Sequence, residues 1–302
     1  MRRSARYERM AALYDREILP IWSERFGRMI LRGLSAPPRA TVLDFACGTG
    51  YPALELLKKL DGGRVVGIDS CAPLLEVARQ KAGDMLSRQI FLRSDELGPK
   101  LAFANEVFDL AISNLGLMDA PDPPGILREL ARVTKPRGRV IVTLPLRGSF
   151  AEFYDIYREV LVRSEKAEAV TRLEEHVARA PEPEQAIAWM HAAGLRPAEL
   201  EMDAFTLLFK SSREFFYAPV IEYGPLSAWK DIAGKGEEMQ EIFLLIKEAI
   251  DAYFGGRSFE LTIKAGCLRG LRAKAGDDRA DEPVPRPEQV SGESYVIEEG
   301  NE

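Results

Sequence analysis

A turn of small residues follows the first apolar run of the chain, and the side chains around it are suited to binding a nucleotide. Residues 42–45 form that run with one acid, Asp44, and Gly48 and Gly50 follow closely. Glycine has no side chain to hold a ligand away, so backbone N–H groups can approach it. About 20 residues later Asp69 ends a second apolar run, where a carboxylate can accept hydrogen bonds from both hydroxyls of a ribose. The spacing predicts a nucleotide-binding turn.

The charge of Asp44 separates two classes of cofactor. Gly48-x-Gly50-x-x-Ala53 followed by Asp69 also fits a nicotinamide dinucleotide, whose anionic pyrophosphate would lie over the turn. A carboxylate at Asp44 would repel that pyrophosphate, whereas S-adenosylmethionine (SAM) brings a cationic amino group and a sulfonium. A pair of unit charges ~4 Å apart at an effective dielectric near 20 is worth about 4 kcal/mol before desolvation. The sign favours SAM and leaves an NAD(P)-dependent oxidoreductase as the weaker alternative.

The same stretch resembles motif I of the class I SAM-dependent methyltransferases. It resembles in particular their type 11 branch, which includes the ubiquinone/menaquinone biosynthesis methyltransferases and carries a V-L-D-x-A-C-G-T-G run, matched here by residues 42–50. Residues 65–69 are similar to the second motif of that family, residues 108–114 to motif IV, and residues 127–138 to its helix-to-strand segment. The resemblance covers roughly residues 7–145. Ala46 and Arg137 depart from it, because many relatives carry glycine there.

The resemblance implies a SAM site and assigns its residues. The expected cofactor-binding residues are Asp44, Ala46, Gly48 and Gly50 in the first turn, Asp69 and Ser70 at the ribose, Asp95 and Glu96 near the adenine, and Asn114 and Tyr14 near the methionine part. Tyr14 belongs to a Tyr-Asp pair that resembles one often found in the N-terminal helix of the family. The pattern identifies no general base, and it predicts no metal site.

Short apolar runs alternate with amphipathic stretches, which is typical of a parallel sheet covered on both faces. Strands are expected at 41–46, 64–69, 89–94, 108–113, 139–144, 199–209 and 259–267, with helices near 52–60, 73–82 and 124–134 between the early ones. This predicts an α/β fold, doubly wound and Rossmann-like, with a seven-stranded, mostly parallel sheet and helical cap additions. The expected parts are an N-terminal helical cap (1–40), a SAM-binding core (41–210) with a helical insertion near 148–180, a helical lid (211–256), the last strand (257–272) and an acidic disordered tail (273–302).

Charge and composition narrow the class of substrate. The net charge is −6, and residues 273–302 hold nine acids and three bases, which leaves 38 of each sign in residues 1–272. A formally neutral body has little long-range attraction for phosphate backbones, so no nucleic-acid partner is expected. Three widely spaced cysteines and the lack of a long apolar run predict a cytoplasmic protein without stable membrane insertion. The oligomeric state is not indicated.

These observations together predict an enzyme that transfers a methyl group from SAM to a small, hydrophobic or aromatic acceptor by in-line displacement. A SAM-binding regulatory protein without transferase activity is the alternative from another class, because no base is evident. Six aromatic residues either line an acceptor pocket or pack the added helices: Phe153, Tyr154, Tyr157, Phe215, Phe216 and Tyr217.

Overall fold

The computed structural model describes residues 2–32, 34–274 and 294–296. The strands are β1 (Thr41–Phe45), β2 (Arg64–Asp69), β3 (Ile90–Ser94), β4 (Phe108–Asn114), β5 (Thr134–Pro145), β6 (Leu195–Phe209), β7 (Phe259–Arg272) and β8 (Ser294–Val296). The α-helices are α1 (Arg2–Leu13), α2 (Ser23–Leu31), α3 (Ala53–Leu57), α4 (Ala72–Ala82), α5 (Pro123–Val133), α6 (Ala151–Arg163), α7 (Ala167–Ala178), α8 (Pro183–Ala192), α9 (Ser212–Tyr217), α10 (Pro219–Glu222), α11 (Leu226–Ala233) and α12 (Gly236–Phe254). A π-helix, η1 (Tyr14–Ile18), and two 3-10 helices, η2 (Gly83–Met85) and η3 (Gly116–Asp119), complete the elements.

The strands form one sheet in the order β3-β2-β1-β4-β5-β7-β6-β8, and β1 to β5 pair in parallel. The predicted α/β fold with a mostly parallel sheet is confirmed. The sheet has one strand more than the predicted seven, because β8 pairs with β6. β8 lies within the segment 273–302, which was expected to be a disordered tail and which shows no alternation of apolar and polar residues that would predict a strand. The rest of that expectation, residues 275–293 and 297–302, lies outside the described residues.

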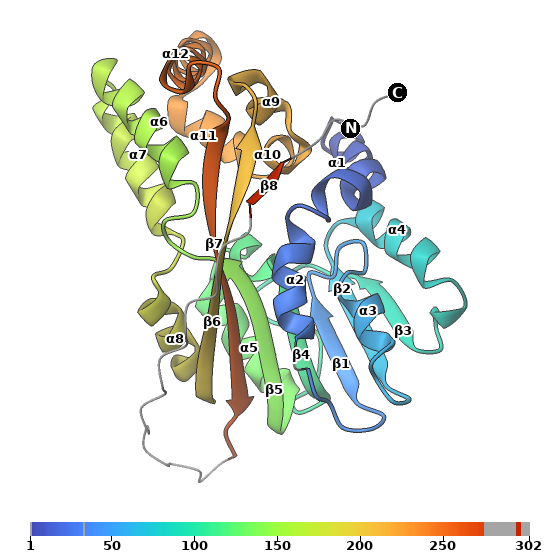
Figure 1. The fold of residues 1–302 in the computed structure, drawn as a ribbon. Helices are drawn as coiled ribbons and strands as arrows, with labels where there is room; N and C mark the ends of the chain where they lie inside the picture. The colour runs from blue at the N-terminus through green and yellow to red at the C-terminus, as the bar shows by residue number, and fades with distance from the viewer. Residues whose placement is uncertain (1, 33, 275–293, 297–302) are drawn as a thin grey trace. The chain divides into compact units, whose positions relative to one another are not determined.

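The strand order reverses beside β1, and this reversal locates the site. From β1 the chain proceeds outward to β2 and β3, and it then returns to place β4 on the other side of β1. The crossover from β1 to β2 contains α3, and the crossover from β4 to β5 contains α5. These two crossovers run in opposite directions along the sheet, so right-handed connections put α3 and α5 on opposite faces (Figure 1). Ligands of such sheets bind outside the carboxyl ends of the strands at the reversal. The turns after β1 and β4 therefore border the expected site.

The chain divides into two compact units, each with its own core. Unit 1 comprises Met1–Leu144, Glu182–Met202 and Ala265–Glu288, and unit 2 comprises Pro145–Pro181, Asp203–Lys264 and Gln289–Glu302. The N-terminal helices expected as a separate cap belong to unit 1. Unit 2 joins the segments expected as insertion and lid with parts of β6 and β7. Every predicted cofactor-binding residue lies in unit 1.

The core of unit 2 is built from aromatic rings. Trp229 of α11 is fully buried, and its ring centroid lies 4.1 Å from that of Phe153 and 5.9 Å from that of Phe215. The hydroxyl of Tyr157 donates a hydrogen bond of 2.6 Å to the carbonyl oxygen of Trp229. Five of the six aromatic residues left open by the sequence pack in this core, whereas Tyr217 is 69% exposed. The cluster forms a packed interior of unit 2.

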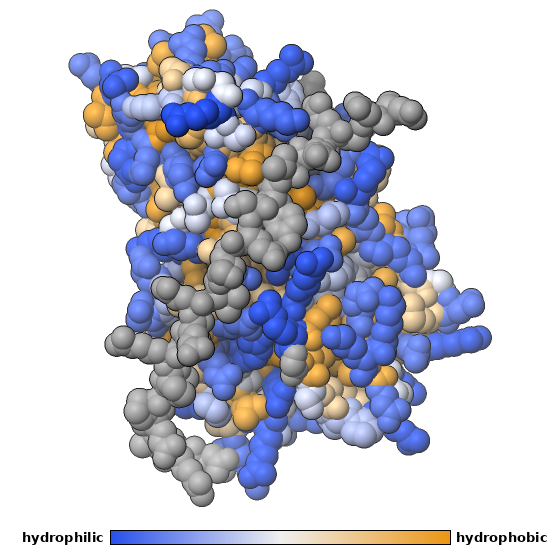
Figure 2. All heavy atoms as spheres, in the orientation of Figure 1, coloured by the Kyte–Doolittle hydropathy of each residue, from blue (hydrophilic) through white to orange (hydrophobic). Residues whose placement is uncertain are grey.

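The surface drawn in Figure 2 is mostly hydrophilic, with small separate apolar patches. Large apolar side chains exposed among the described residues come from many elements: Tyr7, Phe91, Val107, Val162, Met202, Tyr217, Leu244, Leu245 and Tyr253. Within the described ranges, no helix combines the length and the apolar character needed to span a bilayer.

Candidate functional site

The turn between β1 and α3 has the tight, amide-exposing conformation that its glycines predict. Gly48 and Gly50 have positive φ values of 52° and 90°. A Cβ added to Gly50 would lie 3.1 Å from the Leu54 side chain, whereas one added to Gly48 would meet nothing within 4 Å. Gly48 is therefore required by its backbone conformation and Gly50 by conformation and packing together. The N–H of Gly50 closes the turn on the carbonyl of Cys47 at 2.8 Å.

Ala46, the departure from the family's glycine, also adopts a left-handed conformation, with φ of 58°. A residue with a Cβ pays roughly 1–2 kcal/mol for this region relative to the right-handed one. The opposing residue is Gly116 of η3, where an added Cβ would lie only 2.1 Å from the Cβ of Ala46. Glycine at 116 thus provides the space that alanine at 46 needs. The sequence offered no signal for this pairing of two distant positions.

Asp44 is a buried acid without a partner. Its side chain is 0% exposed, and neither carboxylate oxygen has a hydrogen-bond partner among the described residues. Burial, and then the charge of Asp69, raises the pKa of Asp44 well above its usual range. A buried carboxylate in this state is costly unless a cation or a donor neutralises it. The position is therefore suited to receive a cationic group.

Asp69 ends β2 and joins the loops that follow three strands. Its Oδ2 accepts a hydrogen bond from the N–H of Gly48 at 2.8 Å, and its Oδ1 accepts one from the N–H of Cys71 at 2.7 Å. The N–H of Asp95, after β3, donates to the Asp69 carbonyl at 3.1 Å. Burial raises the pKa of the Asp69 carboxyl, although its backbone N–H partners oppose that shift. Each carboxylate oxygen keeps lone-pair capacity for a further donor.

Asn114 and Tyr14 meet on a residue that the sequence did not single out, Ser23 at the start of α2. The Asn114 Nδ2 donates to the Ser23 carbonyl at 2.9 Å, and the Tyr14 hydroxyl lies 2.6 Å from the Ser23 Oγ. The Thr143 hydroxyl donates to the Asn114 Oδ1 at 2.8 Å, which fixes the orientation of the amide. These contacts hold the N-terminal segment against the carboxyl ends of β4 and β5.

The surroundings of Tyr14 are acidic. Burial raises the pKa of the Tyr14 hydroxyl, and the charges of Asp119, Asp69 and Asp15 raise it further. The Lys81 Nζ lies 2.6 Å from the Asp15 Oδ2 and compensates the charge of that carboxylate. Carboxylates gathered at the end of the sheet favour a cationic ligand and disfavour a pyrophosphate.

The remaining predicted residues lie at the edge of this group. The Asp95 carboxylate is 2.5 Å from the Arg93 guanidinium, while Glu96 and Ser70 are exposed. No cluster of described residues has the composition of a metal site. Cys47 is buried, and burial, followed by the charges of Asp44 and Asp69, raises the pKa of its thiol well above the usual range, which disfavours the reactive thiolate.

Three contacting residues escaped sequence reasoning: Asp15, Ser23 and Thr49. The hydroxyl of Thr49, in the turn between Gly48 and Gly50, donates to the Asp15 Oδ1 at 2.6 Å. The sequence held a signal for two of them, because Asp15 is the second member of the Tyr-Asp pair and Thr49 lies in the run 42–50, but neither pattern indicated that they contact each other. Ser23 is a common residue type whose partners lie far along the chain, so spacing could not reveal it.

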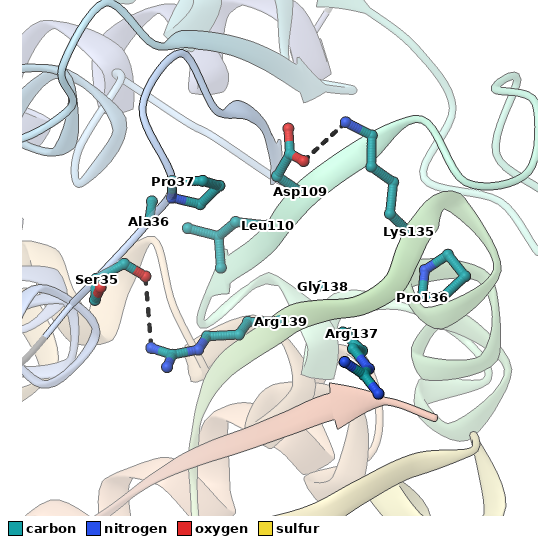
Figure 3. A pocket seen from close by; sticks show the side chains of 10 residues that line it. All are labelled: Ser35, Ala36, Pro37, Asp109, Leu110, Lys135, Pro136, Arg137, Gly138 and Arg139. Carbon is teal, nitrogen blue, oxygen red and sulfur yellow. Dashed lines mark hydrogen bonds and ion pairs between the residues drawn. The ribbon is translucent and has the colours of Figure 1, made fainter. Parts of the chain in front are cut away.

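A pocket of roughly 340 Å³ lies elsewhere in unit 1 (Figure 3). It borders the first residues of β4 and β5, and Asp109 and Lys135 pair there at 2.8 Å. Arg139 reaches toward the Ser35 carbonyl at 3.5 Å. This pocket is at the amino-terminal ends of the parallel strands, whereas the Asp44 and Asp69 carboxylates are near the carboxyl ends. The two sites are thus separate.

Known proteins are similar to this chain in sequence and in fold. Residues 43–142 match a family model described as a methyltransferase domain. The demethylmenaquinone methyltransferase of Clavibacter sepedonicus is 30% identical over 65% of this chain and 83% of its own length. That of Thermus thermophilus is 36% identical over 53% of this chain and 74% of its own. The solved structure of the YcgJ protein from Bacillus subtilis, 16% identical, covers 83% of this chain and 99% of its own with a TM-score of 0.56, which supports the fold.

Sequence identity over most of a relative's length carries more weight than the fold, because one fold hosts many functions. The match includes the turn with Asp44, Gly48 and Gly50 and the strand that ends at Asp69. SAM is the cofactor of this family. The chain therefore belongs to the class I SAM-dependent methyltransferases, in the branch of the demethylmenaquinone and ubiquinone/menaquinone biosynthesis enzymes.

Proposed function

We propose that this methyltransferase acts on a small, apolar, ring-containing acceptor of the quinone-precursor class. The observation that carries the proposal is the similarity to two enzymes named for demethylmenaquinone. The formally neutral charge of residues 1–272 also supports a small molecule over a nucleic acid.

The unpartnered Asp44 carboxylate fits the cationic end of SAM, and the free lone pairs of Asp69 fit the two ribose hydroxyls. The resemblance to the family supports the roles proposed for the other predicted residues: Ala46, Gly48 and Gly50 in the turn, Ser70, Asp95 and Glu96 on the adenosine side, and Tyr14 and Asn114 on the methionine side. The Asn114 amide already donates to Ser23, so its role is to support the wall of the site.

SAM supplies, when bound, a methyl group on a sulfonium whose departure leaves a neutral thioether. The protein consequently has no expelled charge to stabilise. Its contribution is to hold donor and acceptor in line, which can supply about 7–11 kcal/mol. The acidic surroundings of Asp44 and Asp69 retain the cation, and exclusion of water protects the geometry. No general base is assigned.

The acceptor class is tested by incubating the purified protein with methyl-labelled SAM and a panel of acceptors. The panel contains a short-chain demethylmenaquinol, simple phenols, transfer RNA and duplex DNA. We expect label in the quinol and none above background in the nucleic acids. Transfer to RNA or DNA alone, or SAM binding without transfer to any small acceptor, would refute the proposal.

The assignment of Asp69 gives a separate prediction. Asp69→Asn is expected to raise the dissociation constant of S-adenosylhomocysteine about 10- to 100-fold, because hydrogen bonds to a charged group contribute roughly 1.5–3 kcal/mol. It should also lower the melting temperature, since the carboxylate holds the Gly48 and Cys71 amides. Calorimetric titration and thermal unfolding measure the two effects.

Asp61→Asn is the matched control, because Asp61 is an exposed acid in the loop before β2. It should change neither quantity. An unchanged dissociation constant in Asp69→Asn, at temperatures where the variant is folded, would remove Asp69 from the cofactor site.

A further inference from the structure

Asp15 connects three elements of unit 1 through one carboxylate. Its Oδ1 accepts the hydroxyl of Thr49 at 2.6 Å, and its Oδ2 lies 2.6 Å from the Lys81 Nζ of α4. The Thr49 side chain is 1% exposed, whereas Asp15 and Lys81 are each about one-third exposed. The buried hydroxyl thus has a charged acceptor that a surface cation holds in place.

Thr49 stands between the two glycines that shape the cofactor turn. On one side, the N–H of Gly48 donates to the carboxylate of Asp69, and on the other, the N–H of Gly50 donates to Cys47. Both glycines have positive φ, and a glycine can also adopt many other backbone conformations. A fixed side chain at Thr49 restricts this otherwise permissive backbone. The Asp15 bond is what fixes that side chain.

The π-helix η1 explains how neighbouring residues reach different parts of the site. Tyr14 and Asp15 are its first two residues, and adjacent side chains of a helix point in different directions. Tyr14 reaches Ser23, which also holds Asn114 at the end of β4, while Asp15 reaches the turn after β1. Short π-helical turns are frequent at functional sites. The segment η1 therefore makes contacts near the carboxyl ends of both β1 and β4, where the strand order reverses.

We propose that Asp15 is a positioning residue for the cofactor turn. Through Thr49 it holds the Gly48 amide against Asp69, and Lys81 keeps the Asp15 carboxylate in the accepting orientation. Asp15 itself does not touch SAM. Its loss lowers cofactor affinity because the turn must be ordered again at binding. The inference rests on the proposed cofactor assignment of Asp69 and Gly48 and is independent of the acceptor.

The test is a double-mutant cycle on cofactor binding. Asp15→Ala and Thr49→Val remove the same hydrogen bond from its two ends, so each is expected to raise the dissociation constant of S-adenosylhomocysteine about tenfold, with the double variant close to either single one. Thr49→Ser keeps the hydroxyl and should restore affinity to within about threefold. Hydrogen exchange of the Gly48 amide in the ligand-free protein should accelerate in both single variants.

Glu17→Ala is the matched control, since Glu17 lies in the same π-helix and pairs at the surface with Arg16. It should leave affinity and Gly48 exchange unchanged. Melting temperatures of all variants separate positioning from stability. A drop in melting temperature without a change in affinity, or independent effects that multiply in the double variant, would overturn the proposal. A failed acceptor assay would refute the acceptor class alone, because this cycle uses only S-adenosylhomocysteine.

Discussion

Asp44→Asn is expected to weaken SAM binding by at least about 30-fold while making the ligand-free protein more stable at neutral pH. Removing one partner of a buried charge pair costs roughly 2–5 kcal/mol of binding free energy, and 2 kcal/mol corresponds to about a 30-fold higher dissociation constant. The ligand-free gain arises because both Asp44 oxygens are buried without partners, so ionising this group opposes folding. Calorimetric titration and thermal unfolding at pH 7.5 measure the two opposite effects.

The pH dependence follows from the direction of the pKa shift. Burial raises the pKa of Asp44 in the folded protein above its unfolded value. Its contribution to stability is therefore full below the unfolded pKa and is lost as pH rises through the folded pKa. The melting temperature of the wild type should therefore fall as pH rises through this window. The melting temperature of Asp44→Asn should depend less on pH, because the variant lacks this ionising group. SAM affinity should rise with pH over the same window, because binding requires the ionised carboxylate.

Asp109→Asn is a control in which the pKa shift has the opposite direction, at the amino-terminal end of β4. Burial acts to raise the pKa of Asp109, but its bonds with Lys135 and the Thr41 N–H lower it overall. This substitution should destabilise the protein at neutral pH, lose that effect as pH falls through the lowered folded pKa, and leave SAM affinity unchanged. An Asp44→Asn variant that binds SAM as the wild type does would contradict the assignment.

Trp229→Ala should have the largest effect on stability. Replacing a large buried aromatic residue by alanine costs about 3–5 kcal/mol, since a cavity remains. Trp229 is fully buried among Phe153, Phe215 and Phe150, and its indole N–H lies 3.3 Å from the Tyr154 hydroxyl. Because all predicted cofactor residues lie in unit 1, the affinity for S-adenosylhomocysteine at low temperature should stay within about twofold of the wild type.

Differential scanning calorimetry measures the loss of stability. Titration with S-adenosylhomocysteine at about 10–15 °C below the first unfolding transition measures the affinity. Trp189→Ala is the matched control, because Trp189 in α8 is half-buried and should cost much less. Loss of affinity in Trp229→Ala while unit 1 remains folded would contradict the placement of the cofactor residues in unit 1 alone.

Strands β1 to β4 were predictable almost residue for residue, whereas the starts of β5 and β6 were not. The apolar stretches 64–69 and 108–113 coincide with β2 and β4 nearly residue for residue, because burial on both faces gives a continuous apolar signal. β5 begins at Thr134 instead of 139, and its first residues are polar and include Pro136 and Gly138. β6 similarly begins at Leu195 rather than 199. Backbone pairing with a neighbouring strand extends these segments, and no side-chain pattern records it.

The residues of the candidate site likewise fall into those that the sequence predicted and those that it did not. Asp44, Gly48 and Asp69 were recognisable because one strand or one turn sets their spacing. The bond between Asp15 and Thr49 joins residues far apart in the sequence, and it exists only once α1, η1 and the turn are packed. Ala46, in the turn after β1, and Gly116, the first residue of η3, are likewise matched only in the folded protein. Such pairs depend on tertiary contacts, which single-sequence patterns do not carry.

The central claim is that the Asp44 carboxylate binds the cationic amino group of the cofactor. The most direct test compares S-adenosylhomocysteine with methylthioadenosine, which keeps the adenosine but lacks the amino-acid part, in the wild type and in Asp44→Asn. The account predicts a strong preference of the wild type for S-adenosylhomocysteine that falls at least about tenfold in the variant. An equal preference in both proteins would show that Asp44 does not recognise this group.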